Sequence, residues 1–440
     1  MAERLLSVGL DVGTTSTQMV LSELNIENKA GSFSVPEMEI SERKIIYKSP
    51  VRFTPLKGRD LVDAEKLREI IAKEYANAEI DRKSVDTGAI IITGETSRKE
   101  NARAVLEQLS DFAGDFVVAT AGPDLESVLA AKGAGADLYS EKTGKTVLHM
   151  DIGGGTSNLA FIRDGKIIKT GCLNVGGRLL KFDERGVVAY VSPVLRGICD
   201  IKEGDAITEL KAQNVAKILV SALEMAAAKR EATELFRHLT TEGTVMPPEK
   251  ADVISFSGGV ADCIEADIPW MKYGDIGPVL GREIRNSLLC KGEYALGAET
   301  IRATVIGAGC HSAQLSGSTV FYRNITFPLK NVPAVRFDDE AEMHEGAVFW
   351  TVDGDFEPDY SGVVTLADEV IKRVKNGPIY VCIERDMAKA LGQALAMRVS
   401  GDRPILCVDR IRLSPESYMD VGEPVGPALP VVIKTLVLSR

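Results

Sequence analysis

The sequence is poor in the side chains that usually hold metals and in the pairs that build disulfides. It has four histidines and seven cysteines in 440 residues. No two histidines stand at the i, i+4 spacing of a helical zinc site, and the cysteines are scattered, odd in number and without a Cys-x-x-Cys pair. These absences argue against a zinc protein and a disulfide framework, and they favour buried thiols in a reducing compartment.

Long apolar runs and an excess of basic charge are also missing. No run approaches the roughly 18–20 apolar residues that a helix needs to cross a bilayer, and the N-terminal apolar run is broken at Asp11. The formal net charge is −11, and no dense stripe of lysine and arginine opposes it. We therefore expect a cytoplasmic protein that binds neither membranes nor nucleic acid.

What the sequence does contain is a set of glycine-rich loops that follow apolar strands. One apolar run ends at Asp151, and a second begins after Gly153-Gly154-Gly155-Thr156. This pattern predicts a β-hairpin whose glycines let peptide N–H groups converge on an anion such as phosphate. An acid beside such a loop would repel phosphate directly, so the acid fits best with a bridging cation. Glycine-rich hairpins also occur as plain turns, and that alternative stays open.

The N-terminus carries the same pattern. An apolar strand ends at Asp11, and a second apolar strand follows Gly13-Thr14-Thr15. Asp11 and Asp151 are about one domain's length apart. The repetition predicts two related lobes that present matching hairpins to one ligand.

Alternating strands and helices predict an α/β fold. Small residues suggest helices at 125–134 and 294–305, where close helix contact would suit a hinge between lobes. Residues 379–409 read as a strand–helix–strand unit. We expect a first lobe at residues 1–144, a second lobe at 145–309, and a C-terminal α/β domain at 310–440.

Two further glycine motifs occur in the sequence. Gly258-Gly259 follows an apolar strand, and the pattern predicts a helix N-terminus there that could approach a flat ring or a phosphate. Gly144-Lys145-Thr146 invites comparison with an ATP-binding P-loop. The glycine that a P-loop needs five residues earlier is Tyr139, and a strand follows instead of a helix, so we reject that reading.

The loops, in this order and spacing, resemble the actin/Hsp70/sugar-kinase superfamily of two-lobed ATPases with duplicated ribonuclease H-like domains. Residues 10–16 and 150–156 resemble its two phosphate loops, and residues 254–259 resemble its adenosine loop. Within the superfamily, the chain resembles the ethanolamine ammonia-lyase reactivating factors from end to end. The resemblance includes the C-terminal segment 431–437.

This resemblance implies an ATPase that binds an adenosylcobalamin-dependent lyase after the cobalt–carbon bond of its coenzyme has been lost. ATP with Mg²⁺ would drive release of the damaged cobalamin, so that intact coenzyme could replace it. Ethanolamine ammonia-lyase would be the partner. We also hold association with a bacterial microcompartment and a homodimeric state as expectations.

The resemblance also assigns residues. Asp11 and Asp151 would hold hydrated Mg²⁺ and serve catalysis. The phosphates would be cradled by Gly13, Thr14, Thr15, Gly153, Gly154, Gly155 and Thr156, and the adenosine would pack on Gly258 and Gly259.

The chain also departs from the chaperone relatives. Gly122 stands where they have an acid before the hinge proline, and Asn158 stands where many relatives have a second acid. Glu126, one helical turn on, is the candidate for the vacant catalytic role, and Lys99 is the candidate for their phosphate-contacting lysine. These departures suggest slow hydrolysis.

Other classes stay open at this point. A small-molecule kinase would need a substrate pocket with a general base near the γ-phosphate, and no acid stands out for that role. An actin-like filament scaffold would assemble in an ATP-dependent way. A structural protein whose glycine loops are ordinary turns is the third alternative.

Overall fold

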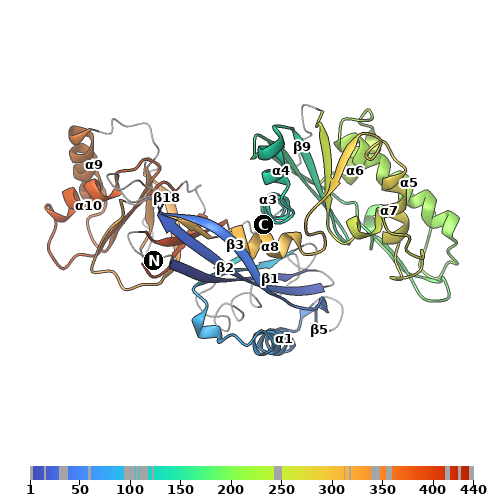
Figure 1. Cartoon of the computed structure of the whole chain (residues 1–440), viewed down its shortest axis with the longest axis horizontal. Helices are drawn as coiled ribbons and strands as arrows, with labels where there is room; N and C mark the ends of the chain where they lie inside the picture. The colour runs from blue at the N-terminus through green and yellow to red at the C-terminus, as the bar shows by residue number, and fades with distance from the viewer. Residues whose placement is uncertain are drawn as a thin grey trace.

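A computed structural model gives the fold as two lobes and a C-terminal domain (Figure 1). It describes residues 3–13, 16–28, 38–57, 61–93, 105, 109, 117–120, 123–241, 250–311, 313–316, 319–337, 347–352, 359–411, 417–424 and 428–435. No helix in these ranges is both long enough and apolar enough to span a membrane.

The first lobe is built on a sheet with the strand order β3-β2-β1-β7-β8. Strand β1 (Glu3–Val12) forms an antiparallel hairpin with β2 (Ser16–Asn28), and β3 (Met38–Lys48) extends it. Strands β7 (Thr87–Ile92) and β8 (Val117–Thr120) continue the sheet in parallel with β1. The shorter elements of this lobe are β4 (Arg52–Phe53), β5 (Leu56–Lys57), β6 (Leu61–Val62) and the 3₁₀ turn η1 (Arg82–Ser84).

The second lobe repeats this sheet, with the order β11-β10-β9-β14-β15. Strand β9 (Val147–Ile152) pairs antiparallel with β10 (Ser157–Arg163), which pairs with β11 (Lys166–Leu173). Strands β14 (Val253–Ser257) and β15 (Glu293–Leu296) run parallel to β9. The repeated order confirms the predicted two-lobed, duplicated α/β architecture. Smaller elements here are β12 (Leu180–Phe182), β13 (Val188–Val191) and η3 (Pro193–Leu195).

Each sheet is covered on its outer face by helices of its own lobe. In the first lobe, Leu67 and Ile71 of α1 (Ala64–Asn77) share a core with Leu10 of β1. The side chain of Asp63 accepts a hydrogen bond from Lys66 N and so caps the start of α1. The outer helices of the second lobe are α5 (Glu209–Ala226), α6 (Glu234–Leu239) and α7 (Gly277–Arg285).

The inner face of each sheet is covered by a helix that follows the sheet of the other lobe in the chain. Helix α3 (Pro123–Gly133) follows the first sheet but packs on β9, β10 and β11 of the second, and α4 (Ala136–Thr143) follows it. Helix α8 (Ala303–His311) follows the second sheet but packs on β1, β2 and β7 of the first. The two helices lie against each other at the centre of the molecule (Figure 1). This crossing confirms the predicted small-residue helix at 125–134 and places it between the lobes.

Two helix predictions in the second lobe were wrong. Residues 294–305 are not one helix, because the segment first completes β15 beside β14 and helix α8 begins only at Ala303. No α-helix starts at Gly258-Gly259 either. The backbone of Gly258 has φ +84° and folds tightly against Ile152, so a three-residue 3₁₀ turn, η4 (Ala261–Cys263), follows instead.

The C-terminal domain is one mixed sheet of order β16-β23-β22-β18-β19-β20-β21-β17 with two helices on one face. The predicted strand–helix–strand unit is confirmed as β20 (Ile379–Ile383), α10 (Ala388–Ala396) and β21 (Ile405–Asp409). The other elements are β16 (Ala313–Leu315), β17 (Phe321–Arg323), β18 (Leu329–Arg336), β19 (Phe349–Val352), α9 (Tyr360–Arg373), β22 (Ser417–Val421) and β23 (Pro430–Thr435).

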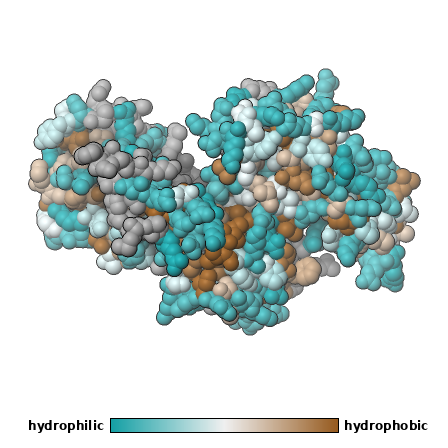
Figure 2. All heavy atoms as spheres, viewed as in Figure 1, coloured by the Kyte–Doolittle hydropathy of each residue, from teal (hydrophilic) through white to brown (hydrophobic). Residues whose placement is uncertain are grey.

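The C-terminal domain is attached to the first lobe. Val432 of β23 shares a small apolar core with Leu5, Leu24 and Ile26 of the first sheet. A cavity of about 480 Å³ lies at this junction, away from Asp11 and Asp151. Figure 2 shows the surface hollowed between the C-terminal domain and the second lobe on this face. The crossed helices α3 and α8 connect the first and second lobes.

Candidate functional site

Asp11 and Asp151 occupy matching positions on sister strands and face the interior between the lobes. Side chains alternate between the faces of a strand. Leu10 packs in the outer core of the first lobe, and Met150 packs in the outer core of the second. Each aspartate therefore points to the opposite face, where α8 covers β1 and α3 covers β9.

The Asp11 carboxylate is held by a hydroxyl from the neighbouring parallel strand. Thr93, which follows β7, donates from Oγ1 to Asp11 Oδ1 at 2.7 Å. Burial raises the pKa of Asp11 to about 7, the hydrogen bond from Thr93 opposes this rise, and the charge of Asp151 adds to it. A cation bound to these carboxylates would offset the cost of burying their negative charge.

Asp151 is held in the same manner. Ser257, at the end of β14, donates from Oγ to Asp151 Oδ1 at 2.5 Å, and Thr304 in the first turn of α8 donates to Oδ2 at 3.4 Å. Burial raises the pKa of Asp151 to about 6, and both hydroxyls lower it. The carboxylate thus joins its own sheet to the helix that covers the other sheet.

A buried histidine orients the serine that donates to this carboxylate. His149 lies two residues before Asp151, with Nε2 2.9 Å from Ser257 Oγ and Nδ1 3.1 Å from Ser255 Oγ. Ser257 gives its one proton to Asp151, so Nε2–H must donate to Ser257 and Nδ1 must accept from Ser255. Burial lowers the pKa of His149 to about 3, so the ring is neutral and fixes the direction of the hydroxyl.

The loop after Asp151 is shaped so that its N–H groups turn outward. Gly153 O accepts from Gly177 N at 3.0 Å, and Gly154 O accepts from Arg178 N at 2.6 Å. In a planar trans peptide the next N–H points away from the carbonyl. The N–H groups of Gly154 and Gly155 are therefore turned away from residues 177–178, as an anion-binding nest requires.

The corresponding turn in the first lobe has the same closing bond. Gly13 N donates to Ser16 O at 2.9 Å, just as Gly153 N donates to Thr156 O at 2.9 Å. Thr14 and Thr15, between these residues, lie outside the described part of the chain, as do Gly122 and Lys99.

The third glycine loop lies against the second one. A Cβ on Gly258 would stand 2.3 Å from Ile152 O, so only glycine lets β14 turn so close to the Asp151 hairpin. Gly258 N donates to Thr300 O at 3.0 Å, and Gly259 faces Ile301. The loop is thereby tied to residues 299–302, the segment that leads into α8.

Glu126 is hydrogen-bonded to Asn158, the cross-strand neighbour of Asp151. Glu126 is buried in α3, and its Oε2 accepts from Asn158 Nδ2 at 2.7 Å. Asn158 in turn stands directly across the hairpin from Asp151. Glu126, one helical turn after Pro123, is therefore separated from Asp151 of the candidate metal site by the side chain of Asn158.

The sequence reasoning missed five side chains of this region. They are Gln18, Thr93, His149, Ser257 as a carboxylate partner, and Thr304. The alternation of β9 could have indicated His149, because it shares a face with Asp151. Thr93 and Thr304 have no local signal, since they reach the carboxylates from distant parts of the chain.

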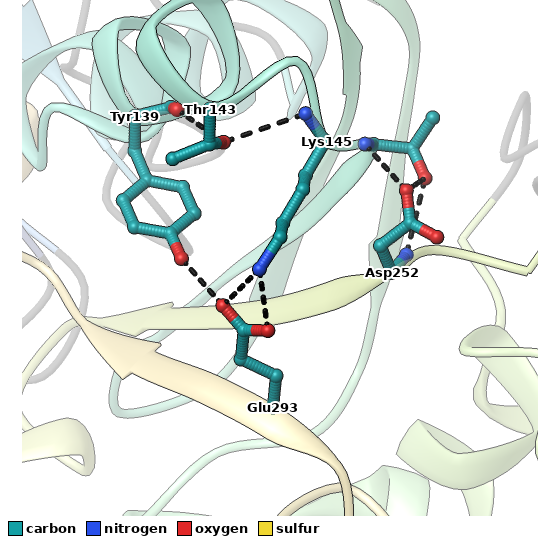
Figure 3. Close-up of polar contacts among 6 residues, drawn as sticks. Tyr139, Thr143, Lys145, Asp252 and Glu293 are labelled. Atoms are coloured by element: carbon teal, nitrogen blue, oxygen red, sulfur yellow. Dashed lines mark hydrogen bonds and ion pairs between the residues drawn. The ribbon is translucent and has the colours of Figure 1, made fainter.

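The rejected P-loop motif has a different role, shown in Figure 3. Lys145 Nζ lies 2.7 and 2.6 Å from the carboxylate oxygens of Glu293, and Tyr139 donates to the same carboxylate at 2.7 Å. Thr146 donates to Asp252 through its N–H and its hydroxyl. These groups surround the start of β9, whereas Asp151 lies at its far end, so they brace the sheet.

A divalent cation would find two carboxylates here rather than a full protein cage. Within the described ranges, no group of three or more His, Cys, Asp or Glu side chains is placed to hold a metal. Mg²⁺ suits such a site, because it keeps several waters and binds through one or two carboxylates plus phosphates. The buried amide oxygens Gln18 Oε1 and Asn158 Oδ1, on residues paired across the strands with Asp11 and Asp151, fit that hydrated ion.

Comparison with known proteins assigns the family. A family model described as "Ethanolamine utilisation protein EutA" matches residues 3–349 and 344–439. Two relatives named ethanolamine ammonia-lyase reactivase EutA, from Salmonella typhimurium (strain LT2) and Escherichia coli (strain K12), are each 37% identical over 463 residues, covering 98% of both chains.

Solved structures similar to part of the chain include a Ppx/GppA phosphatase from Aquifex aeolicus, with TM-score 0.40, 15% identity and coverage of 70% of this chain and 99% of that one. Another is ethanolamine utilization protein EutJ from Carboxydothermus hydrogenoformans, with TM-score 0.36, 18% identity and coverage of 69% and 88%. On the match of the family model and of the two full-length relatives, the chain belongs to the ethanolamine utilisation protein EutA family.

Proposed function

We propose that the chain is an ATP-dependent reactivating factor for ethanolamine ammonia-lyase. The observation that carries the proposal is its 37% identity, over 98% of both chains, to relatives named as reactivases of that lyase. The duplicated hairpins and the position of both aspartates on the inter-lobe faces of their sheets support the nucleotide part of the proposal. The factor would bind the inactivated lyase and release damaged cobalamin, so that intact adenosylcobalamin could enter.

In this proposal, ATP lies between the lobes. Asp11 and Asp151 hold hydrated Mg²⁺, which would neutralise phosphate charge. Backbone N–H groups of the two hairpins and the hydroxyls of Thr14, Thr15 and Thr156 hold the phosphates, and Gly258-Gly259 lets the adenosine approach the backbone. Glu126 would orient or deprotonate the attacking water beside Asn158.

ATP would act on the lyase through lobe closure. A ligand that contacts both lobes favours the closed state, and it can shift the equilibrium only by its difference in affinity for the two states. The crossed helices α3 and α8 provide the hinge. We take residues 1–144, 145–309 and 310–440 as the three working parts, with the last carried by the first lobe.

The decisive experiment is reactivation. Purified lyase is inactivated, freed of unbound coenzyme, and mixed with the protein, ATP, Mg²⁺ and fresh adenosylcobalamin. We expect activity to return with ATP and not with the protein alone. No recovery above the sample without the protein would contradict the proposal, and the Asp151→Asn variant is the matched negative control.

A further inference from the structure

Two buried amide side chains stand opposite the two aspartates. Gln18 on β2 is the cross-strand partner of Asp11, and Asn158 on β10 is the cross-strand partner of Asp151. Directly opposed residues of an antiparallel pair point to the same face of the sheet. Each amide therefore shares the inter-lobe face with its aspartate. Because the two sheets repeat one strand order, the two pairs correspond to each other.

In both amides the nitrogen is bonded and the oxygen is not. Gln18 Nε2 donates to Ile301 O at 3.2 Å, and Asn158 Nδ2 donates to Glu126 Oε2 at 2.7 Å. Within the described residues, Gln18 Oε1 and Asn158 Oδ1 have no hydrogen-bond partner, although each residue is only 4% exposed. Buried acceptors without donors are uncommon in proteins, and a bound water, ion or ligand is one explanation for them.

The chemistry of these groups selects the species that would satisfy them. Two carboxylates and two amide oxygens are all acceptors, so they suit a species that offers only donors. A hydrated divalent cation presents O–H groups in every direction. The hydrated Mg²⁺ suggested by the two carboxylates is such a species.

We propose that Gln18 and Asn158 are a duplicated pair of water-mediated ligands for this cation. Their amide oxygens accept hydrogen bonds from the water molecules of the ion held between Asp11 and Asp151. The inference rests on the proposed nucleotide function and adds two positioning residues to it. Gln18 is anchored to the segment before α8, so the cation site is completed only when that segment lies against the first sheet.

The test compares ADP affinity with and without the cation. Calorimetry gives the Kd for ADP in Mg²⁺ and in EDTA, and the ratio of the two reports the contribution of the metal. Loss of a group that supports a metal ligand typically costs about 10–100-fold in metal affinity. We expect Gln18→Leu and Asn158→Leu each to lower this ratio by about tenfold, with the Kd in EDTA unchanged. Asn25→Leu, on the same strand as Gln18, is the matched control.

A second variant separates this role from a structural one. Gln18→Glu keeps an acceptor oxygen but loses the donor to Ile301 O. It should retain the Mg²⁺ dependence if the oxygen binds cation water, and it should resemble Gln18→Leu if only the bond to Ile301 matters. The latter result overturns the inference.

The two proposals fail in different ways. Suppose that Gln18→Leu and Asn158→Leu keep the wild-type ratio of the two Kd values, while Asp151→Asn loses it. That result overturns the role of the amides and leaves the nucleotide function intact. An unchanged ratio in Asp151→Asn overturns the metal site of the proposed function, and the amide pair with it.

Discussion

At the scale of single residues, burial controls the chemistry of the two aspartates. Each carboxylate is desolvated on the inter-lobe face and receives hydroxyl donors, Thr93 for Asp11 and Ser257 with Thr304 for Asp151. Desolvation is the larger effect, so the pKa of each rises above 3.8. The two buried carboxylates therefore favour protons, and a cation bound there would have to displace them.

This gives a pH prediction with a definite sign. Both pKa values are raised on folding, so the two groups contribute stability that is full below pH 3.8 and is lost as the pH rises through about 6 and 7. In EDTA, wild type should therefore lose stability relative to Asp11→Asn/Asp151→Asn between pH 4 and 7. With Mg²⁺, its thermal stabilisation by the ion should grow over the same range. Unfolding curves at four pH values measure both, and a parallel course of the two proteins would contradict the prediction.

Glu126 gives a second prediction at this scale. Glu126→Gln keeps an acceptor for Asn158 Nδ2 but removes the charge. If Glu126 acts on the attacking water, ATP turnover should fall by about 10² or more, while the Kd for ADP stays the same. Phosphate release and calorimetry measure the two quantities. Glu141→Gln, an exposed acid on α4, is the control, and unaltered turnover in Glu126→Gln would remove the residue from the mechanism.

At the scale of elements, the fold depends on the crossing of α3 and α8. A Cβ on Gly133 would lie 1.8 Å from Ala303 O, and a Cβ on Gly307 would lie 2.0 Å from Leu129 O. Strand β1 approaches helix α8 just as closely, since a Cβ on Gly9 would lie 2.3 Å from Val305 O. Glycine is needed at these positions because backbones meet there.

We therefore expect Gly307→Ala to lower the free energy of unfolding, whereas the same substitution within a helix usually raises it. Within a helix, glycine to alanine normally stabilises by about 1 kcal/mol. Here the added methyl group must push two helices apart, and we expect a loss of about 1–3 kcal/mol in the free energy of unfolding. Urea denaturation measures it. Gly401→Ala, at a position with open space around the Cβ, should be near neutral; equal stability of the two variants would mean that the helices do not cross so closely.

At the scale of the whole molecule, the segment 299–302 joins the Gly258-Gly259 loop to the first lobe. Thr300 O accepts from Gly258 N, whereas Glu299 forms an ion pair with Lys48 and Arg302 donates to Ser49 O at 3.2 Å. A nucleotide bound at the Gly258-Gly259 loop would therefore influence the edge of the first sheet through these contacts. The C-terminal domain would move with that lobe, because it is packed on the same sheet.

The ion pair between the lobes can be tested directly. Both partners are about one-third exposed, so the pair is worth at most about 1 kcal/mol and is weakened by salt. Lys48→Met should weaken ADP binding about two- to fivefold, and more at low salt than at high salt. The matched control is Lys145→Met, because the pair of Lys145 with Glu293 lies within the second lobe (Figure 3). Equal losses in the two variants would rule out a link between the lobes.

The sequence alone was sufficient for features that depend on neighbours in the chain. The hairpins at Asp11 and Asp151 are local, because a strand, a tight glycine turn and a second strand follow one another within about fifteen residues. Their repetition predicted two lobes, and the strand order β3-β2-β1-β7-β8 and its copy confirm them. The small residues of α3 likewise indicated close helix contact before any partner was known.

Only the tertiary structure decided which side chains complete the site. Residues 294–305 read as one helix because their composition is small and apolar, but pairing with β14 made the first part a strand. Gln18 and His149 sit in strands whose neighbours are mostly apolar, and their polar partners, Ile301 O and Ser257, lie more than a hundred residues away. The sequence by itself determined where the two hairpins form, because their hydrogen bonds are local. What surrounds their aspartates was decided by packing between distant segments, which no local pattern records.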